Sequence, residues 1–240
     1  MAGIADNLQV VKARIRRAAD AAKRDPAAVT LLAVSKMHLA ERVREAQAAG
    51  QKAFGENYVQ EALEKMQGFQ GLEWHLIGPL QSNKTRVVAE RFDWVHTVAS
   101  EKIARRLAEQ RPAGAAALNV LVQVNASGEA SKSGIAPAEA RALCVQITGL
   151  KNLRLRGLMA IPEPGAARAR FHEVRVLFDE LKSEFGFDTL SMGMSDDMET
   201  AIAEGATMVR IGTAIFGSRN SAQPPAREAR SPLVRGAKVE

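Results

Sequence analysis

Residues 29–66 read VTLLAVSKMHLAERVREAQAAGQKAFGENYVQEALEKM, and this stretch holds two successive units of a short apolar strand and an amphipathic helix. We predict strands at 29–35 and 52–55, and helices at 39–49 and 61–66. A strand joined to the next strand by a helical crossover is the unit from which parallel sheets are built. The stretch therefore predicts an α/β fold.

The same alternation continues along the chain. Further strands are predicted at 73–78, 93–98, 119–124, 153–161, 188–192 and 207–211, each followed by helical periodicity or a glycine turn. Before the first strand, Ile4, Leu8, Val11 and Ile15 recur at helical spacing. Eight units favour a closed barrel over an open doubly wound sheet. We expect one (β/α)8 TIM barrel over residues 1–217, with an extra N-terminal helix.

Composition restricts the class of protein. The 240 residues are 46% apolar and 25% charged, which is typical of a soluble globular chain and not of a disordered or fibrous one. No apolar run approaches the roughly 18 residues that span a membrane, and the N-terminus lacks the continuous apolar core of a signal peptide. Because Cys144 is the only cysteine, no intrachain disulfide and no cysteine-based metal site can form. A cytoplasmic location is expected, with a transit peptide at the basic N-terminus as the alternative.

The net charge of +6 raises the possibility of nucleic-acid binding, but its distribution argues against it. Residues 218–240 hold five basic and two acidic residues and are rich in Pro, Ser and Arg. We interpret this segment as a basic, disordered tail. The remaining body is almost balanced in charge, so we do not expect nucleic acid as a partner.

In a barrel, functional side chains gather where the strands end. Lys36 follows the first strand and shares the parity of Leu32 and Val34, so its ammonium is expected to be partly desolvated. Desolvation favours the neutral amine, which attacks an aldehyde to form a Schiff base. A surface lysine is the alternative. Asn57 follows the second strand and either orients a ligand or caps a helix.

Histidines in the third and fourth strands, His75 and His96, are expected to be structural, and their spacing predicts no metal site. The last two strands end in glycine and hydroxyl turns. These turns contain Ser195, and Gly212 with Thr213. Barrels often build phosphate sites from these two loops, although ordinary turn chemistry is the alternative.

Arg210 precedes the last turn on an apolar strand, and a buried guanidinium needs a partner. An internal salt bridge with Asp196 or Glu56 is one possibility. The other is a ligand that combines an aldehyde for Lys36, a phosphate and a polar atom facing Arg210. Pyridoxal 5'-phosphate (PLP) has all three.

Six segments carry a resemblance to a known family: AVSK (33–36), FGENYVQE (54–61), WHLIGPLQSNK (74–84), GLMAIP (157–162), LSMGMSDDMETAI (190–202) and VRIGTAIFG (209–217). In this order they resemble the pyridoxal phosphate homeostasis family of YggS-like proteins. The resemblance covers residues 31–217 and implies a fold-type III PLP-binding barrel like the N-terminal domain of alanine racemase.

The resemblance also implies roles for individual residues. Lys36 is the Schiff-base lysine, Asn57 a neighbour of the cofactor and Arg210 the partner of the ring nitrogen. The phosphate ligands are Ser195, Gly212 and Thr213. The resemblance implies a PLP carrier or regulator with no established catalytic activity, and we expect PLP-dependent apoenzymes as recipients and a monomer or weak dimer.

Other functions remain open on the sequence alone. One is a PLP-dependent racemase or decarboxylase, but the resembling racemases use a tyrosine from a second domain, and Tyr58 is the only tyrosine here. An arginine at the ring nitrogen also keeps that nitrogen unprotonated, which weakens carbanion chemistry. Another possibility is an aldolase-like enzyme that forms a Schiff base with a sugar phosphate.

Overall fold

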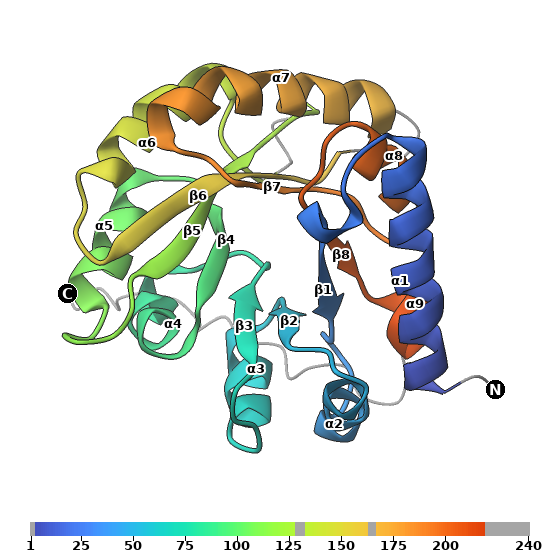
Figure 1. Cartoon of the computed structure of the whole chain (residues 1–240). Helices are drawn as coiled ribbons and strands as arrows, with labels where there is room; N and C mark the ends of the chain where they lie inside the picture. Colours follow the sequence, from blue (N-terminus) through green and yellow to red (C-terminus); the bar gives the residue numbers. More distant parts are fainter. Residues whose placement is uncertain (1–2, 128–132, 163–166, 219–240) are drawn as a thin grey trace, which may run out of the picture.

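Eight parallel strands form a sheet that closes into a barrel (Figure 1). The computed structural model describes residues 3–127, 133–162 and 167–218. The strands are β1 (Thr30–Val34), β2 (Ala53–Glu56), β3 (Glu73–Leu76), β4 (Trp94–Val98), β5 (Leu118–Val124), β6 (Leu153–Ala160), β7 (Thr189–Ser191) and β8 (Met208–Ile211). Each strand pairs with the next in chain order, and β8 returns to pair with β1, where Leu32 lies opposite Arg210. The predicted barrel is confirmed.

Helices cover the outside of this barrel (Figure 1). They are α1 (Ile4–Ala21), α2 (Ala40–Ala48), α3 (Val59–Met66), α4 (Thr85–Arg91), α5 (Glu101–Gln110), α6 (Ala140–Thr148), α7 (Ala167–Phe185), α8 (Met198–Ala203) and α9 (Thr213–Phe216). Three short 3₁₀ helices accompany them: η1 (Pro26–Ala28), η2 (Ser82–Lys84) and η3 (Pro137–Glu139). None of the helices in the described ranges is long and apolar enough to cross a membrane.

The extra N-terminal helix, α1, packs beside the last helices of the chain, α8 and α9 (Figure 1). Its predicted apolar face, Ile4, Leu8, Val11 and Ile15, is buried. Polar contacts extend the packing, since Asn7 Nδ2 donates to the Ile215 carbonyl at 2.8 Å. The helix therefore closes the seam where the two ends of the described barrel meet.

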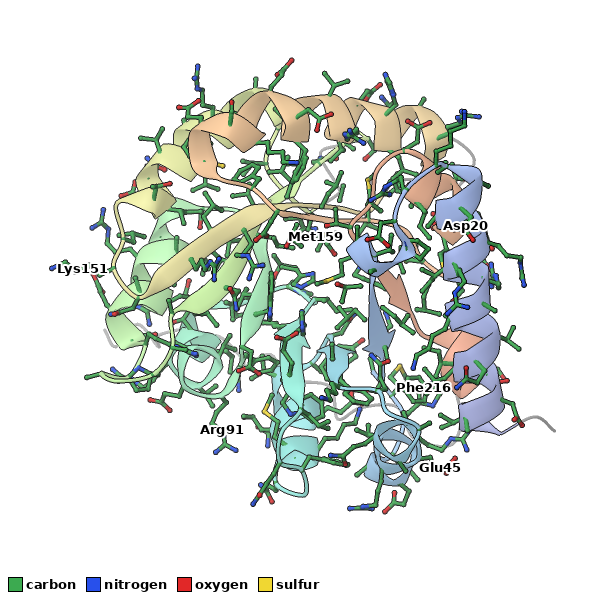
Figure 2. All side chains as sticks on the ribbon, viewed as in Figure 1. Asp20, Glu45, Arg91, Lys151, Met159 and Phe216 are labelled. Carbon is green, nitrogen blue, oxygen red and sulfur yellow. The ribbon has the colours of Figure 1, made fainter. Side chains whose placement is uncertain are left out.

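The core has two layers. The larger lies between the sheet and the helices, and the smaller fills the inside of the barrel. The inner layer includes Leu32 and Met208 in one cluster, and Trp94 and Met159 in another. Figure 2 shows Met159 near the centre of the barrel, whereas Lys151 lies at its periphery. The barrel is a packed solid, and a ligand must bind at one of its ends.

Most differences from the sequence-based prediction lie at the ends of elements. The helix expected after the strand at 119–124 begins as η3 and continues as α6, because Pro137 occupies the first helical position of a short 3₁₀ turn. The four-residue α9 was not predicted. Residues 219–240 lie outside the described residues, so the division into a barrel of 217 residues and a tail stays a prediction.

Candidate functional site

The six candidate residues lie at the carboxyl ends of four strands. They are Lys36 after β1, Asn57 after β2, Ser195 after β7, Arg210 within β8, and Gly212 and Thr213 after β8. These strands are neighbours in the closed sheet, in the order β7, β8, β1, β2. Because the strands are parallel, all six residues belong to the same end and the same side of the barrel.

Arg210 provides a fixed cation near this end. The residue is only 4% exposed. Its Nη1 donates to the carbonyl and Oγ of Ser191, at 2.8 and 2.9 Å, and its Nη2 donates to the Ala160 carbonyl at 3.0 Å. Burial lowers the pKa of Arg210 to about 10, so the guanidinium remains charged at neutral pH. Neutral acceptors thus hold a buried cation in one orientation.

The salt bridge considered for Arg210 does not form. Its guanidinium makes no ion pair within the described part of the chain, and Glu56 is paired with Lys65 instead, at 2.7 Å. Nε of Arg210 likewise makes no hydrogen bond to a described residue. The charge of Arg210 is therefore available to an electron-rich atom of a ligand.

Lys36 is half-buried in the turn after β1, and its backbone is fixed by a buried ionic cluster. Lys65, only 6% exposed, donates through Nζ to the Ser35 carbonyl, Glu56 Oε1 and Glu61 Oε1, each at 2.7 Å. Ser35 Oγ donates to the same Glu56 oxygen at 2.6 Å. The residue before Lys36 is thus fixed through both its carbonyl and its side chain.

The residue after Lys36 is held as well. Met37 has φ of +62°, a conformation that costs about 1–3 kcal/mol for a side chain other than glycine. Its backbone N–H donates to Glu61 Oε1, which also binds Lys65. Sequence reasoning missed this cluster, because Lys65 and Glu61 are ordinary helix-surface residues until their helix is placed against β1 and β2.

Asn57 does not cap a helix. The N-cap of α3 is Tyr58, and the Asn57 side chain makes no hydrogen bond to a described residue. A Cβ at Gly78, after β3, would lie 2.1 Å from the Asn57 carbonyl oxygen. The glycine of the WHLIGP segment therefore lets these loops approach closely, and the half-buried Asn57 amide keeps its hydrogen-bonding capacity for a ligand.

The loops predicted to bind phosphate also depend on close approach. Gly193 has φ of +94°, and a Cβ there would lie 2.5 Å from the Ala201 Cβ. A Cβ at Gly212 would lie 3.2 Å from the Val34 carbonyl oxygen. Ser195 is half-buried and Thr213 is exposed, so hydroxyl groups are present in both loops. The two turns therefore pack tightly where β8 meets β1 and β7.

His75 and His96 are buried inside the barrel and contact each other, His75 Nδ1 lying 2.9 Å from His96 Nε2. His96 Nδ1 is in turn 3.2 Å from Ser191 Oγ, which binds Arg210. Within the described ranges, no three His, Cys, Asp or Glu side chains are arranged to hold a metal ion. The structural interpretation of these histidines was therefore incomplete, since they are linked to Arg210.

Known protein families and sequences resemble this chain over most of its length. The model of the family described as "Alanine racemase, N-terminal domain" matches residues 7–220. A pyridoxal phosphate homeostasis protein of Pseudomonas aeruginosa is 60% identical over 228 residues, covering 93% of this chain and 99% of that protein. The protein of the same name from Escherichia coli K12 is 55% identical over 230 residues, covering 92% and 98%.

Solved structures also resemble this chain over most of its length. PipY of Synechococcus elongatus PCC7942, solved with PLP bound, is 40% identical, with a TM-score of 0.74 over 85% of this chain and 100% of that one. An alanine racemase of Clostridium difficile 630 has a TM-score of 0.71 at 15% identity, which shows a shared fold. The match covers 90% of this chain but 58% of the racemase.

Proposed function

The chain belongs to the family of pyridoxal phosphate homeostasis proteins, and from this premise we propose that it binds PLP at the carboxyl end of the barrel. The observation that carries the proposal is the PLP-bound structure of PipY, which matches this chain over most of its length at 40% identity. PLP supplies an aldehyde that condenses with an amine, and in this chain Lys36 is the proposed Schiff-base residue.

The residues of the site fit the chemical groups of PLP. Arg210 offers a charged N–H that has no described partner, and we assign it to the ring nitrogen. The loops with Ser195, Gly212 and Thr213 supply hydroxyl and backbone N–H donors for the phosphate. Asn57, with an uncommitted amide, neighbours the cofactor. These assignments are supported by the common placement of the residues at neighbouring strand ends.

We further propose that the protein holds and releases PLP within the cell without strong catalysis. A permanent cation at the ring nitrogen disfavours protonation of that nitrogen, which weakens the ring as an electron sink. The similar proteins of Pseudomonas aeruginosa and Escherichia coli K12 are also named for homeostasis. PLP-dependent apoenzymes are the proposed recipients, and transfer to a PLP-free enzyme would appear as recovered activity of that enzyme.

Borohydride trapping tests the site. The PLP-loaded protein is reduced and digested, and peptide mapping is expected to find the label on Lys36. Lys36→Ala is expected to lose the visible absorbance band, whereas Lys151→Ala, at the periphery of the barrel, keeps it. Label on another lysine, or loss of the band in both variants, would contradict the assignment.

The absence of strong catalysis has its own test. The PLP-loaded protein is incubated with a panel of amino acids, and racemisation and decarboxylation are followed by chiral chromatography and CO₂ release. We expect rates no faster than those of free PLP. Enzyme-like turnover that disappears in Lys36→Ala would identify a racemase or decarboxylase instead.

A further inference from the structure

A row of polar side chains crosses the inside of the barrel and ends at Arg210. Glu73 Oε1 lies 2.7 Å from His75 Nε2, and His75 Nδ1 lies 2.9 Å from His96 Nε2. His96 Nδ1 lies 3.2 Å from Ser191 Oγ, which is 2.9 Å from Arg210 Nη1. The row starts at the first residue of β3 and ends near the carboxyl end of β8. Four consecutive hydrogen bonds therefore connect the two ends of the barrel.

The direction of every hydrogen bond in this row follows from its two ends. A guanidinium can only donate, so Ser191 Oγ accepts from Arg210 and its own proton goes to His96 Nδ1. His96 then carries its proton on Nε2 and donates to His75 Nδ1. His75 in turn carries its proton on Nε2 and donates to the Glu73 carboxylate. One proton order satisfies all four contacts, with a cation at one end and an anion at the other.

The environment of the row keeps the two histidines neutral, as this order requires. His75 and His96 are fully buried, and burial lowers the pKa of each below the ordinary value for histidine. The hydrogen bond from His75 holds the pKa of Glu73 below its ordinary value. At neutral pH, Glu73 is therefore ionised and both imidazoles are uncharged.

The two ends face different surroundings. The Glu73 side chain is 46% exposed and lines a pocket of about 300 Å³ with Lys52 and Asp93 at the amino ends of β2, β3 and β4. Other charges act on the row: Asp93 on His75, Arg156 on Glu73, and Asp197 on Arg210. Solvent thus reaches one end of the row, while the other end lies at the proposed cofactor site.

A local irregularity lies beside His96, whose position inside the barrel follows from ordinary strand alternation with Trp94. The pairing of β4 with β5 shifts between Val95 and Val98, so that β4 has one additional residue at His96 and Thr97. Bulges of this kind redirect a side chain and occur often beside functional sites. The Trp94 ring stacks on His75 at 5.2 Å with an interplanar angle of 7°, which fixes the plane of that imidazole.

We propose that Glu73, His75, His96 and Ser191 form a directed hydrogen-bond relay that positions Arg210 and couples it to the ionisation of Glu73 at the amino-end pocket. The inference rests on the proposed function, since Arg210 acts there on the cofactor ring. The four residues are positioning residues. Through them, protons or cations that reach Glu73 from the pocket change the electrostatics of bound PLP from the opposite end of the barrel.

Histidine NMR tests the relay without the cofactor. With ¹⁵N-labelled histidine, both rings are expected as Nε2–H tautomers in the ligand-free protein. Glu73→Gln is expected to shift the ring ¹⁵N signals of His96, which does not touch Glu73, as well as those of His75. Asp93→Asn removes a charge of the same sign from the same pocket and is expected to leave the His96 signals in place. Unchanged His96 signals in Glu73→Gln would overturn the relay.

The PLP-loaded protein provides the second readout. Loss of the Glu73 charge disfavours cationic forms, so Glu73→Gln is expected to lower the apparent pKa of the visible band, about a twofold or greater change in the proton dissociation constant. Ser191→Ala removes the link to Arg210, and in that background Glu73→Gln is expected to have no further effect. An equal shift in Asp93→Asn, or one that persists in the Ser191→Ala background, would show a through-space field and refute the relay.

The two readouts also separate this inference from the proposed function. If no visible band forms in the wild-type protein, the assignment of PLP to Lys36 fails, and the NMR result still decides whether the relay exists. If the band forms and the His96 signals do not respond to Glu73→Gln, the proposed function stands and the relay fails.

Discussion

The buried pair Lys65 and Glu56 controls the position of Lys36. One Glu56 oxygen binds Lys65 and Ser35, and the other has no hydrogen-bond partner among the described residues. Burial raises the pKa of Glu56 to about 7, although Lys65 opposes the shift. Buried ion pairs contribute little to stability in themselves but are costly to break. The pair therefore acts mainly to fix the turn that carries Lys36.

The raised pKa of Glu56 predicts a pH-dependent stability. The folded protein binds this proton more tightly than the unfolded chain, so the contribution to stability is complete below about pH 4.5 and is lost as pH rises toward 7. In Glu56→Gln this dependence is expected to disappear, and the difference amounts to at most about 3 kcal/mol. Urea unfolding of both proteins between pH 4.5 and 8 measures it.

A matched control uses an exposed carboxylate of the same kind. Glu45→Gln removes a half-exposed group that pairs with Arg42 at the surface, and it is expected to follow the wild-type pH profile. If Glu56→Gln and the wild-type protein lose stability in parallel between pH 4.5 and 7, Glu56 does not titrate in this range.

Strand parity was sufficient to propose Lys36 and Arg210 as candidates, because a polar residue on an apolar strand is visible in the sequence; their roles stay predictions. The relay was not predictable in the same way. The contact between His96 on β4 and Ser191 on β7 spans the inside of the barrel, and which residues of non-neighbouring strands meet there has no local sequence signal. The Glu56–Lys65 pair was missed for a related reason, since it depends on how α3 packs against β2.

The turn between β7 and α8 is the element most sensitive to substitution near the site. Gly193 combines a positive φ with a position where a Cβ would lie 2.5 Å from the Ala201 Cβ. Gly193→Ala is expected to lower the free energy of unfolding by about 2–4 kcal/mol, from strain plus overpacking. It is also expected to weaken PLP binding, because the turn carries Ser195.

Gly50 supplies the comparison for this prediction. Its φ is +85°, and nothing lies within 4 Å of a Cβ there, so Gly50→Ala measures backbone strain without a clash. Gly50→Ala is expected to lower the free energy of unfolding by about 1 kcal/mol. Equal losses in the two variants, measured by urea unfolding, would show that the contact with Ala201 relaxes freely.

Among the elements, those with strong periodicity were predicted within a few residues of their ends. The helix expected after the strand at 93–98 is observed as Glu101–Gln110, and the Ser100 side chain caps it by accepting from the Ile103 N–H at 3.4 Å. The four-residue α9 was missed because its pattern is too short to show a period. Tertiary packing against α1 supports it instead.

The whole barrel is closed, so the described strands leave no unpaired edge to which another chain could add. Eight repeated units made this architecture predictable from the sequence. The register of the strand pairing was not predictable, and this register determines which side chains meet inside the barrel. The fold was therefore more accessible to sequence reasoning than the network that the fold encloses.

The reactivity of Cys144 on α6 can be used to measure global unfolding. The thiol is fully buried, and burial raises its pKa to about 12. We expect the native protein to react with Ellman's reagent at least about a thousandfold more slowly than the urea-unfolded chain, because labelling requires unfolding. Cys144→Ser gives the background rate. Rapid labelling under native conditions would show that α6 detaches without global unfolding.

The contact of α1 with α8 and α9 has a consequence for biosynthesis. Residues 4–21 leave the ribosome long before residues 198–216, which cover their apolar face. At about 5–20 residues per second, the delay is roughly 10–40 s. Throughout that interval α1 lacks its contacts with α8 and α9, although its neighbour α2 has already been translated. The first apolar face to be translated is among the last to be covered, so the nascent chain is the form that most needs chaperone protection.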